Sequence, residues 1–215
     1  MKTILIDLWG TLLANGFSFD GIINSLGHQH THKEIINLCK EEGLFSKTVS
    51  SLTIWEGVLS RLGYEKEKAK EINDLWLDSA KRVNMFPGTR EFLSNLRKEG
   101  HLLVLASAID RDSFELLEKE FSFKDHFDHI KTSYTVGLNK SIAFYQKICD
   151  DLNQEPKQCI MIGDNIDADI LPADKVGLST ILLSRFLLAD QEKDLLPSKT
   201  RVCQTYEEVL EAISN

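Results

Sequence analysis

The fold is decided by a short stretch near the start of the chain, which reads Ile4-Leu5-Ile6-Asp7-Leu8-Trp9-Gly10-Thr11-Leu12. Its first three residues are apolar and lead into a polar turn, a pattern typical of an inner strand of a parallel sheet. Ligands of open α/β sheets collect outside the carboxyl ends of the strands. The carboxylate of Asp7 is therefore expected where chemistry takes place, although an Asp here also suits a plain turn cap.

Three further apolar segments lead to polar groups of different kinds. The segment 102–106 ends at Ser107, and the segment 159–162 runs into the acidic stretch 163–169. Lys140 follows the segment 132–139 and precedes a helical pattern. Because parallel strands present their carboxyl ends at one edge of a sheet, these groups are expected to gather at that edge.

The order of these groups, an Asp, a hydroxyl, a Lys and an acidic cluster, resembles that of the haloacid dehalogenase superfamily. The resemblance implies an α/β fold in which a Rossmann-like parallel sheet core carries an inserted, all-helical cap of the C1 type. It also implies a hydrolase, a phosphatase that acts on a small phosphorylated metabolite through an aspartyl-phosphate.

The resemblance also implies roles for individual residues. Asp7 is the implied nucleophile, and Ser107 and Lys140 are the catalytic groups that hold the phosphoryl group. Mg²⁺ is the implied cofactor, with Asp7, the backbone carbonyl of Trp9, Asp164 and Asp169 as its ligands. The residues implied to contact the phosphate are Gly10, Thr11, Ser107, Ala108 and Asn165.

The chemistry is consistent with this set of residues on general grounds. A carboxylate that attacks a phosphate dianion meets charge repulsion, which a divalent cation and an ammonium group relieve. Asp7, Asp164 and Asp169 would repel one another in an empty site, so they need Lys140 and a cation, or a shifted pKa. Asp167 is an alternative to Asp169 as a metal partner, but Asp169 fits the family spacing and is preferred.

Trp9 departs from the pattern of the family's phosphatases, which place a second Asp there to protonate the leaving group and to deprotonate the attacking water. The indole N–H is only a donor and does neither. The loss of this acid and base is expected to slow turnover by about 10²–10⁴. It should favour acyl or aryl phosphates, whose leaving groups need little protonation. Asp110 is a candidate replacement, but a helix-capping role is the preferred interpretation.

Two other functions stay open. Metal-independent 2-haloacid dehalogenases of the superfamily have an aromatic residue in a D-x-Y-G-T motif, which is similar to residues 7–11. Their fourth motif resembles S-S-N, whereas this chain has the acidic G-D-N version at residues 163–165. The second alternative is a weakly catalytic member that binds a phosphorylated ligand or a protein. The complete set of motif residues favours the phosphatase.

Composition narrows the class of protein. The chain has 215 residues, 42% of them hydrophobic, which is enough for one core and a small accessory domain. The net charge of −8 argues against nucleic acid and an anionic membrane surface as partners. No apolar stretch has the length of a membrane span or of a signal peptide. Cysteines without a C-x-x-C pair favour reduced thiols in a cytoplasmic protein.

The pattern along the chain changes from alternating strands and helices to helices alone, and then back. We therefore predict a discontinuous Rossmann-like catalytic core, residues 1–14 and 86–215, and a helical cap, residues 15–85. A cap on two short hinges is expected to close over the site and to exclude water.

Several cap residues have a structural interpretation that we prefer to a functional one. Trp55 and Trp76 lie at helical core spacing and are interpreted as packing residues. Lys47, Thr48 and Arg61 are expected at the surface rather than on a substrate.

The segment 28–32 contains three histidines, but no nearby Cys or carboxylate before Glu34 completes a metal site. We interpret it as a loop that leads into a helix, with Thr31 and Glu34 as the capping box.

Overall fold

The computed structural model describes residues 1–14, 19–44, 49–186 and 188–214. Within these residues lies a six-stranded sheet in which all neighbouring strands are parallel. The strand order, β3-β2-β1-β4-β5-β6, is that of a Rossmann-like sheet. The strands are β1 (Thr3–Ile6), β2 (Leu102–Ser107), β3 (His129–Thr132), β4 (Cys159–Gly163), β5 (Ser179–Leu183) and β6 (Arg201–Cys203).

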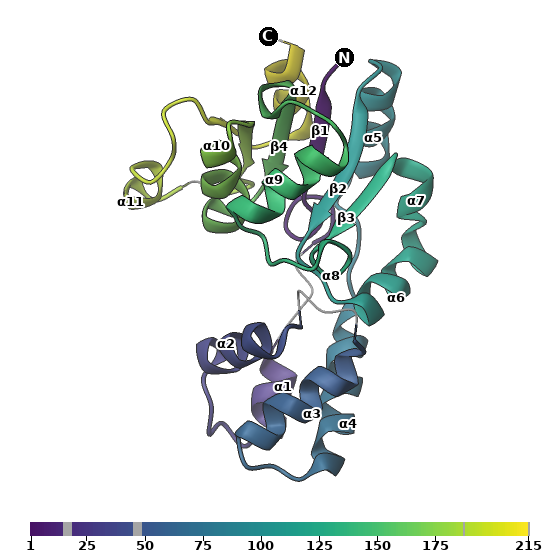
Figure 1. Cartoon of the computed structure of the whole chain (residues 1–215), viewed down its shortest axis with the longest axis vertical. Helices are drawn as coiled ribbons and strands as arrows, with labels where there is room; N and C mark the ends of the chain where they lie inside the picture. Colours follow the sequence, from purple (N-terminus) through teal and green to yellow (C-terminus); the bar gives the residue numbers. More distant parts are fainter. Residues whose placement is uncertain (15–18, 45–48, 187, 215) are drawn as a thin grey trace.

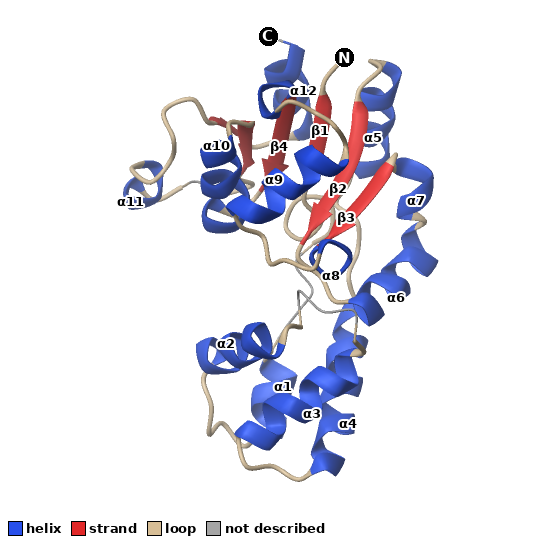
Figure 2. Ribbon diagram, in the orientation of Figure 1, coloured by secondary structure: helices blue, strands red, loops and turns tan. Residues whose placement is uncertain are grey.

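Helices cover both faces of the sheet, which explains the continuous apolar runs of its strands (Figure 2). Successive side chains of a strand point to opposite faces. The helices of this part are α5 (Thr89–Lys98), α6 (Arg111–Phe121), α7 (Phe123–His126), α8 (Ser133–Val136), α9 (Ile142–Asp151), α10 (Leu171–Val176), α11 (Asp190–Lys193) and α12 (Tyr206–Ser214). Ile4 and Ile6 of β1 pack with residues of α5, α6 and α12, whereas Leu5 packs with residues of α9 and α10.

A separate helical unit lies near the carboxyl ends of the strands (Figure 1). It consists of α1 (Asp20–Ser25), α2 (His32–Glu42), α3 (Ser51–Arg61) and α4 (Lys66–Ala80). This unit has its own hydrophobic cluster, to which Trp55 and Trp76 belong, with their ring centroids 5.8 Å apart. Both residues are therefore packing residues, as predicted. The α/β class with an inserted helical part is also confirmed, whereas the boundaries at residues 15 and 85 stay a prediction.

The chain enters and leaves the helical unit at one place. The backbone N–H of Ala14 donates to the carbonyl of Asn84 at 2.9 Å, and that of Phe86 donates to the carbonyl of Leu12 at 3.0 Å. These contacts hold the two connecting segments side by side, close to the turn that follows β1.

Polar contacts, one of them buried, join the helical unit to α6. The indole Nε1 of Trp76 donates to Asp110 at 2.9 Å, and the other carboxylate oxygen of Asp110 accepts from the backbone N–H of Ser113. Asp110 therefore caps α6, as preferred from the sequence. Ser51, at the start of α3, donates to the carboxylate of Asp112 through its backbone N–H at 2.7 Å and its hydroxyl at 3.0 Å.

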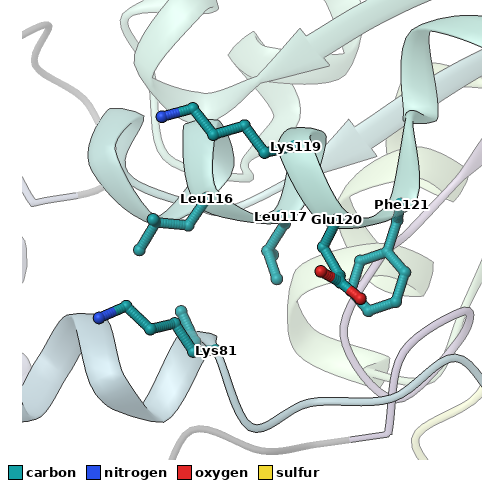
Figure 3. A pocket seen from close by; sticks show the side chains of 7 residues that line it. Lys81, Leu116, Leu117, Lys119, Glu120 and Phe121 are labelled. Carbon is teal, nitrogen blue, oxygen red and sulfur yellow. The ribbon is translucent and has the colours of Figure 1, made fainter.

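The contact between α4 and α6 is incomplete. A groove of about 210 Å³ remains between the end of α4 and the outer face of α6 (Figure 3). Lys81 borders it on one side, and Leu116 and Phe121 border it on the other. The hydrogen bonds of Trp76 and Ser51 thus help to fix the helical unit against α6.

The remaining cap residues have local roles where the structure describes them. Arg61 forms exposed ion pairs with Glu41 and Glu42, as expected for a surface residue. The predicted Lys47 and Thr48 lie outside the described residues. None of the helices in the described part of the chain is long and apolar enough to cross a membrane.

The histidine segment leads into a capped helix, as expected. The hydroxyl of Thr31 accepts from the backbone N–H of Glu34 at the start of α2, which is half of the predicted capping box. His30 lies 3.3 Å from the carboxylate of Glu34, and His32 lies 3.5 Å from that of Asp20.

The hydrogen bond between Trp76 and Asp110 should make a measurable contribution to stability. Trp76→Phe leaves a buried carboxylate with one donor fewer, at a cost of about 1–3 kcal/mol in the free energy of unfolding. Trp55→Phe is the matched control, because Trp55 lies in the same cluster and its Nε1 has no hydrogen-bond partner among the described residues. Urea unfolding should show the larger loss for Trp76→Phe, and equal losses would contradict this assignment.

Candidate active site

The candidate site lies at the carboxyl ends of β1 and β4, the two central strands. They pair with Ile6 opposite Ile162, and the backbone N–H of Asp7 donates to the carbonyl of Ile162 at 2.9 Å. The strand order runs outward in both directions from this pair, so the two strands flank the switch point where such sheets bind ligands. Asp7 and Asp164 each follow one of these strands, and the sheet thus brings two distant parts of the sequence into one crevice.

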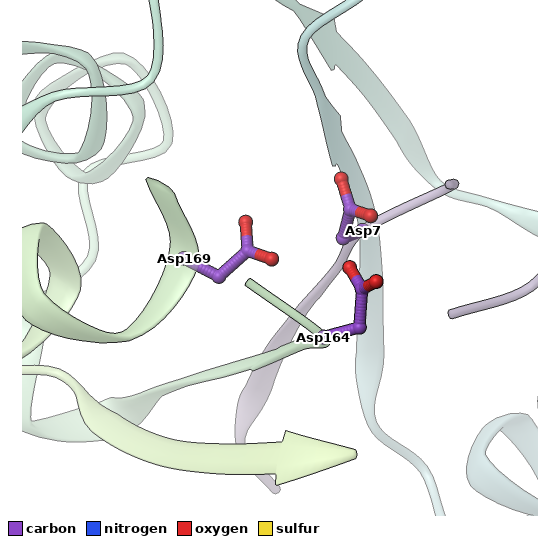
Figure 4. Close-up of side chains that lie close together, drawn as sticks. All are labelled: Asp7, Asp164 and Asp169. Atoms are coloured by element: carbon purple, nitrogen blue, oxygen red, sulfur yellow. The ribbon is translucent and has the colours of Figure 1, made fainter. Parts of the chain in front are cut away.

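Carboxylates from three positions meet in this crevice (Figure 4). Oxygen atoms of Asp7, Asp164 and Asp169 all lie within 4.8 Å of one another. Asp169 belongs to η2 (Ile166–Ile170), a single π-helical turn that follows β4, and such turns are frequent at functional sites. Asp167 lies in the same turn but is exposed and not part of the cluster. The cluster thus contains the acidic residue that was preferred from the sequence.

Lys140 neutralises part of the negative charge. Its Nζ lies 2.5 Å from Oδ1 of Asp7 and forms a second ion pair with Oδ1 of Asp169. Both ion pairs are buried, and the side chain of Lys140 is only 5% exposed. Tyr145 adds a hydroxyl that donates to the carbonyl of Ala168 at 2.9 Å and lies 3.4 Å from the same oxygen of Asp169. The sequence presents Tyr145 only as a residue in a helical pattern, because its contact depends on how α9 packs against η2.

Burial and mutual repulsion shift the pKa values in this cluster. Desolvation raises the pKa of Asp7 to about 7, and the charges of Asp169 and Asp164 add to the increase, while Lys140 opposes it. Desolvation and the charge of Asp169 also raise the pKa of Asp164 to about 6. Burial by itself lowers the pKa of Lys140, but Asp169 and Asp7 outweigh it and raise this pKa well above its ordinary value. The cluster therefore holds more negative charge than its one ammonium group balances.

The backbone around the cluster is shaped to hold the carboxylates close together. Gly10 has a φ of +72°, and a Cβ at this position would lie 1.9 Å from Oδ2 of Asp164. A Cβ at Gly163 would lie 2.2 Å from Oδ2 of Asp169. Side chains are therefore excluded at both positions. Hard divalent cations such as Mg²⁺ prefer oxygen ligands, and the negative charge of these carboxylates exceeds what Lys140 balances. Mg²⁺ therefore suits the cluster, and Asp7, Asp164 and Asp169 are the residues that would hold it.

Two hydroxyl groups predicted to contact phosphate are buried, and neither has a hydrogen-bond partner in the part of the chain that the structure describes. Ser107 ends β2, Thr11 lies in the turn after β1, and both residues are 0% exposed. Neither Oγ of Ser107 nor Oγ1 of Thr11 has a hydrogen-bond partner among the described residues. A buried hydroxyl without a partner is costly, about 1–3 kcal/mol. A ligand that supplies acceptor oxygens would remove this cost.

The other predicted site residues occupy the same edge of the sheet. Ala108 directly follows β2 and is half-buried, and Trp9 is half-buried in the turn after β1, where it packs against the core. Asn165 is committed to the backbone, because its Oδ1 accepts from the N–H of Ala168 and its own N–H donates to Asp169. Asn165 thus positions η2, and a contact of its side chain with phosphate stays a prediction.

Arg185 lies beside the site, although no motif in the sequence indicates it. Its Nη2 donates to the carbonyl of Thr11 at 3.0 Å, and its guanidinium carbon lies 3.9 Å from the ring centroid of Phe86. The same carbon lies 4.8 Å from the ring centroid of Tyr206, whose hydroxyl donates to the same carbonyl of Thr11 at 2.6 Å. The C-terminal helix and the loop after β5 therefore hold the turn that carries the proposed nucleophile.

Comparison with known proteins agrees with this geometry. The chain matches the haloacid dehalogenase-like hydrolases over residues 1–177, and it therefore belongs to this family. A glyceraldehyde 3-phosphate phosphatase from Pyrococcus furiosus is 31% identical over 98 residues, which are 44% of this chain and 40% of that protein. The chain thus spans less than half the length of this curated relative.

Solved structures share the fold over nearly the whole chain. The 2-haloacid dehalogenase from Pseudomonas syringae pv. Tomato has a TM-score of 0.69 at 17% identity and covers 100% of this chain and 98% of its own. The HAD-hydrolase YfnB from Bacillus subtilis, in a structure bound to magnesium, has a TM-score of 0.67 at 16% identity, with coverages of 100% and 99%. At these identities the likeness shows the fold alone.

The raised pKa values predict how the stability of the metal-free protein depends on pH. Asp7 has a pKa of about 7 in the folded protein, compared with an ordinary value of 3.8. As the pH falls, it therefore binds its proton at a higher pH in the folded protein than in the unfolded chain. Its contribution to the free energy of unfolding should therefore increase between pH 7 and pH 4, by roughly a few kcal/mol. Urea unfolding in chelator should show this as a difference between the native protein and Asp7→Asn. A difference independent of pH would contradict the raised pKa.

Proposed function

We propose that this protein is a Mg²⁺-dependent phosphatase that hydrolyses a small phosphorylated metabolite through an aspartyl-phosphate on Asp7. The observation that carries the proposal is the cluster of Asp7, Asp164, Asp169 and Lys140, in which only Asp164 is exposed. The hydroxyl of Ser107, at the end of the neighbouring strand, has no partner among the described residues. A nucleophile and an excess of carboxylates suit phosphoryl transfer, in which a cation and an ammonium group offset the charge of the phosphate.

In the first step a carboxylate oxygen of Asp7 attacks phosphorus, and the bond from phosphorus to the leaving oxygen breaks. The ammonium group of Lys140 holds Asp7 in place, and together with the Ser107 hydroxyl it contacts the phosphoryl oxygens. A bound Mg²⁺, held by Asp7, Asp164, Asp169 and the carbonyl of Trp9, would lower the charge repulsion between nucleophile and phosphate. The leaving group departs with the electron pair of the broken bond.

In the second step water attacks the aspartyl-phosphate, inorganic phosphate leaves and the Asp7 carboxylate is restored. Both steps require a proton carrier near the leaving oxygen, and Trp9 offers only an indole N–H. Asp110 is occupied by Trp76 and by the backbone of α6, which argues against it as a substitute. We therefore propose that the enzyme favours acyl or aryl phosphates, or a substrate that carries its own proton donor.

The arrangement of the chain supports this chemistry. We propose that residues 15–85 form the cap, which would exclude water from the aspartyl-phosphate when it closes, and that residues 1–14 and 86–215 form the catalytic core. The relative named glyceraldehyde 3-phosphate phosphatase supports a small phosphorylated metabolite as the substrate. The free, buried cysteines Cys39, Cys149, Cys159 and Cys203 support a reducing compartment, the cytoplasm, as the place of action.

The proposal predicts phosphate release from an aryl phosphate that requires Mg²⁺ and is lost in chelator. Asp7→Asn removes the nucleophile and should abolish release. Asp167→Asn, an exposed acid near the same cluster, is the matched control and should retain the native rate. Halide release from a 2-haloacid in chelator would instead support the dehalogenase alternative that Trp9 leaves open. Absence of both activities would contradict catalysis on these substrates.

A second prediction concerns the leaving group. Trp9→Asp restores the missing acid and should raise kcat for an alkyl phosphate by up to about 10²–10⁴, with a much smaller gain for an aryl phosphate. Trp9→Phe is the control and should bring no gain, because phenylalanine has no titratable group. Equal native rates on leaving groups of very different acidity would contradict the proposed role of position 9.

A further inference from the structure

A cavity of about 410 Å³ opens beside the candidate active site. Gly10 and Asp164 belong to its lining, so the cavity borders the acidic cluster directly. The loop after β5 also contributes to the lining, through Ser184, Arg185 and the largely exposed Phe186. A molecule whose phosphoryl group lies at Asp7 would have room here for the remainder of its structure.

Arg185 is the cationic residue of this lining, and its environment holds the guanidinium group in place. The group stacks on Phe86 and Tyr206, and Nη2 donates to the carbonyl of Thr11. Stacking of this kind fixes the planar fork of donors that binds carboxylate or phosphate in two-point contacts. Arg185 would therefore meet a ligand with little further loss of side-chain freedom.

Among the described residues, Arg185 interacts electrostatically with Asp164, which also lines the cavity, but forms no close ion pair with it. Arg61, Arg97 and Arg111 each form an ion pair with a carboxylate. In the part of the chain that the structure describes, Arg185 forms no such ion pair, and its Nε is buried without a hydrogen-bond partner. A fixed guanidinium with unused binding capacity, placed on the wall of a cavity in a protein of net charge −8, suits an anionic ligand.

We propose that Arg185 and this cavity form a subsite for a second anionic group of the substrate, a carboxylate or a second phosphate. The proposal rests on the proposed function, because the first phosphate is placed at Asp7. The apolar part of the lining, which includes Ala14, Phe86 and Leu183, suits a short carbon chain between the two anionic groups. The substrate class is thus a small phosphorylated acid or a small bisphosphate.

Arg185 also holds the turn after β1 in place through its hydrogen bond to Thr11. The loss of this structural contact must therefore be distinguished from the loss of a contact with the substrate. The substrate pair 3-phosphoglycerate and sn-glycerol 3-phosphate makes this distinction possible, because the two differ by one carboxylate in place of a hydroxymethyl group. Propane-1,3-diol bisphosphate tests a phosphate, instead of a carboxylate, as the second anionic group. Loss of the contact with Thr11 would lower kcat/KM on all substrates by the same factor. Loss of the contact with the second anionic group would lower it only for substrates that carry such a group.

The native enzyme is expected to prefer 3-phosphoglycerate, propane-1,3-diol bisphosphate or both to sn-glycerol 3-phosphate by about 10- to 100-fold in kcat/KM. Whichever is preferred identifies the second anion. Arg185→Gln should bring the ratio close to one, mainly through KM, and Arg185→Lys should restore part of it. Arg90→Gln, an exposed arginine against His126, is the matched control and should keep the native ratio. A native ratio near one, or a ratio unchanged in Arg185→Gln, would overturn the subsite.

A binding measurement distinguishes failure of the subsite from failure of the proposed function. Calorimetric titration of 3-phosphoglycerate and propane-1,3-diol bisphosphate into Asp7→Asn, with and without Arg185→Gln, requires no turnover. If Asp7→Asn binds these compounds only when Arg185 is present, while the native protein releases no phosphate from them, the subsite would be supported and the phosphatase contradicted. Phosphate release without any dependence on Arg185 would support the phosphatase and overturn the subsite.

Discussion

The structure depends most on one electrostatic constraint, the presence of three carboxylates around one buried ammonium group. Asp7 and Asp169 both contact Lys140, and Asp164 lies against the same cluster. Taking these charges out of water is unfavourable unless opposite charge and hydrogen bonds compensate. Lys140 balances only part of the negative charge, so the proposed divalent cation would reduce the remaining repulsion between the carboxylates. A phosphate, itself an anion, would bind at this place only with that compensation.

The backbone is built around this cluster. Gly10 lets the backbone approach the carboxylate of Asp164 closely, because a Cβ at position 10 would clash with it. Gly163 does the same for Asp169. The turn after β1 is also held from outside, because Arg185 and Tyr206 both donate to the carbonyl of Thr11. The C-terminal third of the chain therefore contributes to the site by fixing the turn that follows Asp7, as well as by supplying acidic residues.

Because of Trp9, the candidate site has groups for charge stabilisation but lacks the usual group for proton transfer. The residues that would hold a phosphoryl group and a cation are present and close together, whereas the usual proton carrier is replaced by an indole. The proposed subsite at Arg185 would select substrates through a second anionic group rather than through the leaving group. Under the proposed function, selectivity would then depend on the chemistry of the substrate more than on a general acid.

The sequence by itself determined the α/β class, the helical insertion and the set of candidate site residues. Asp7, Ser107 and Asp164 each follow or end an apolar strand, and parallel strands present such positions at one edge, so these three residues could be placed without coordinates. The segment 132–139 before Lys140, expected as another apolar strand, instead contains the helix α8, so the prediction of a strand there was wrong. Tertiary structure alone decided the contacts of Tyr145 with η2, of Trp76 with Asp110 and of Arg185 with Thr11, which lies 174 positions away. The physical reason is that local periodicity records which face of an element is buried, but not which distant residue lies against it.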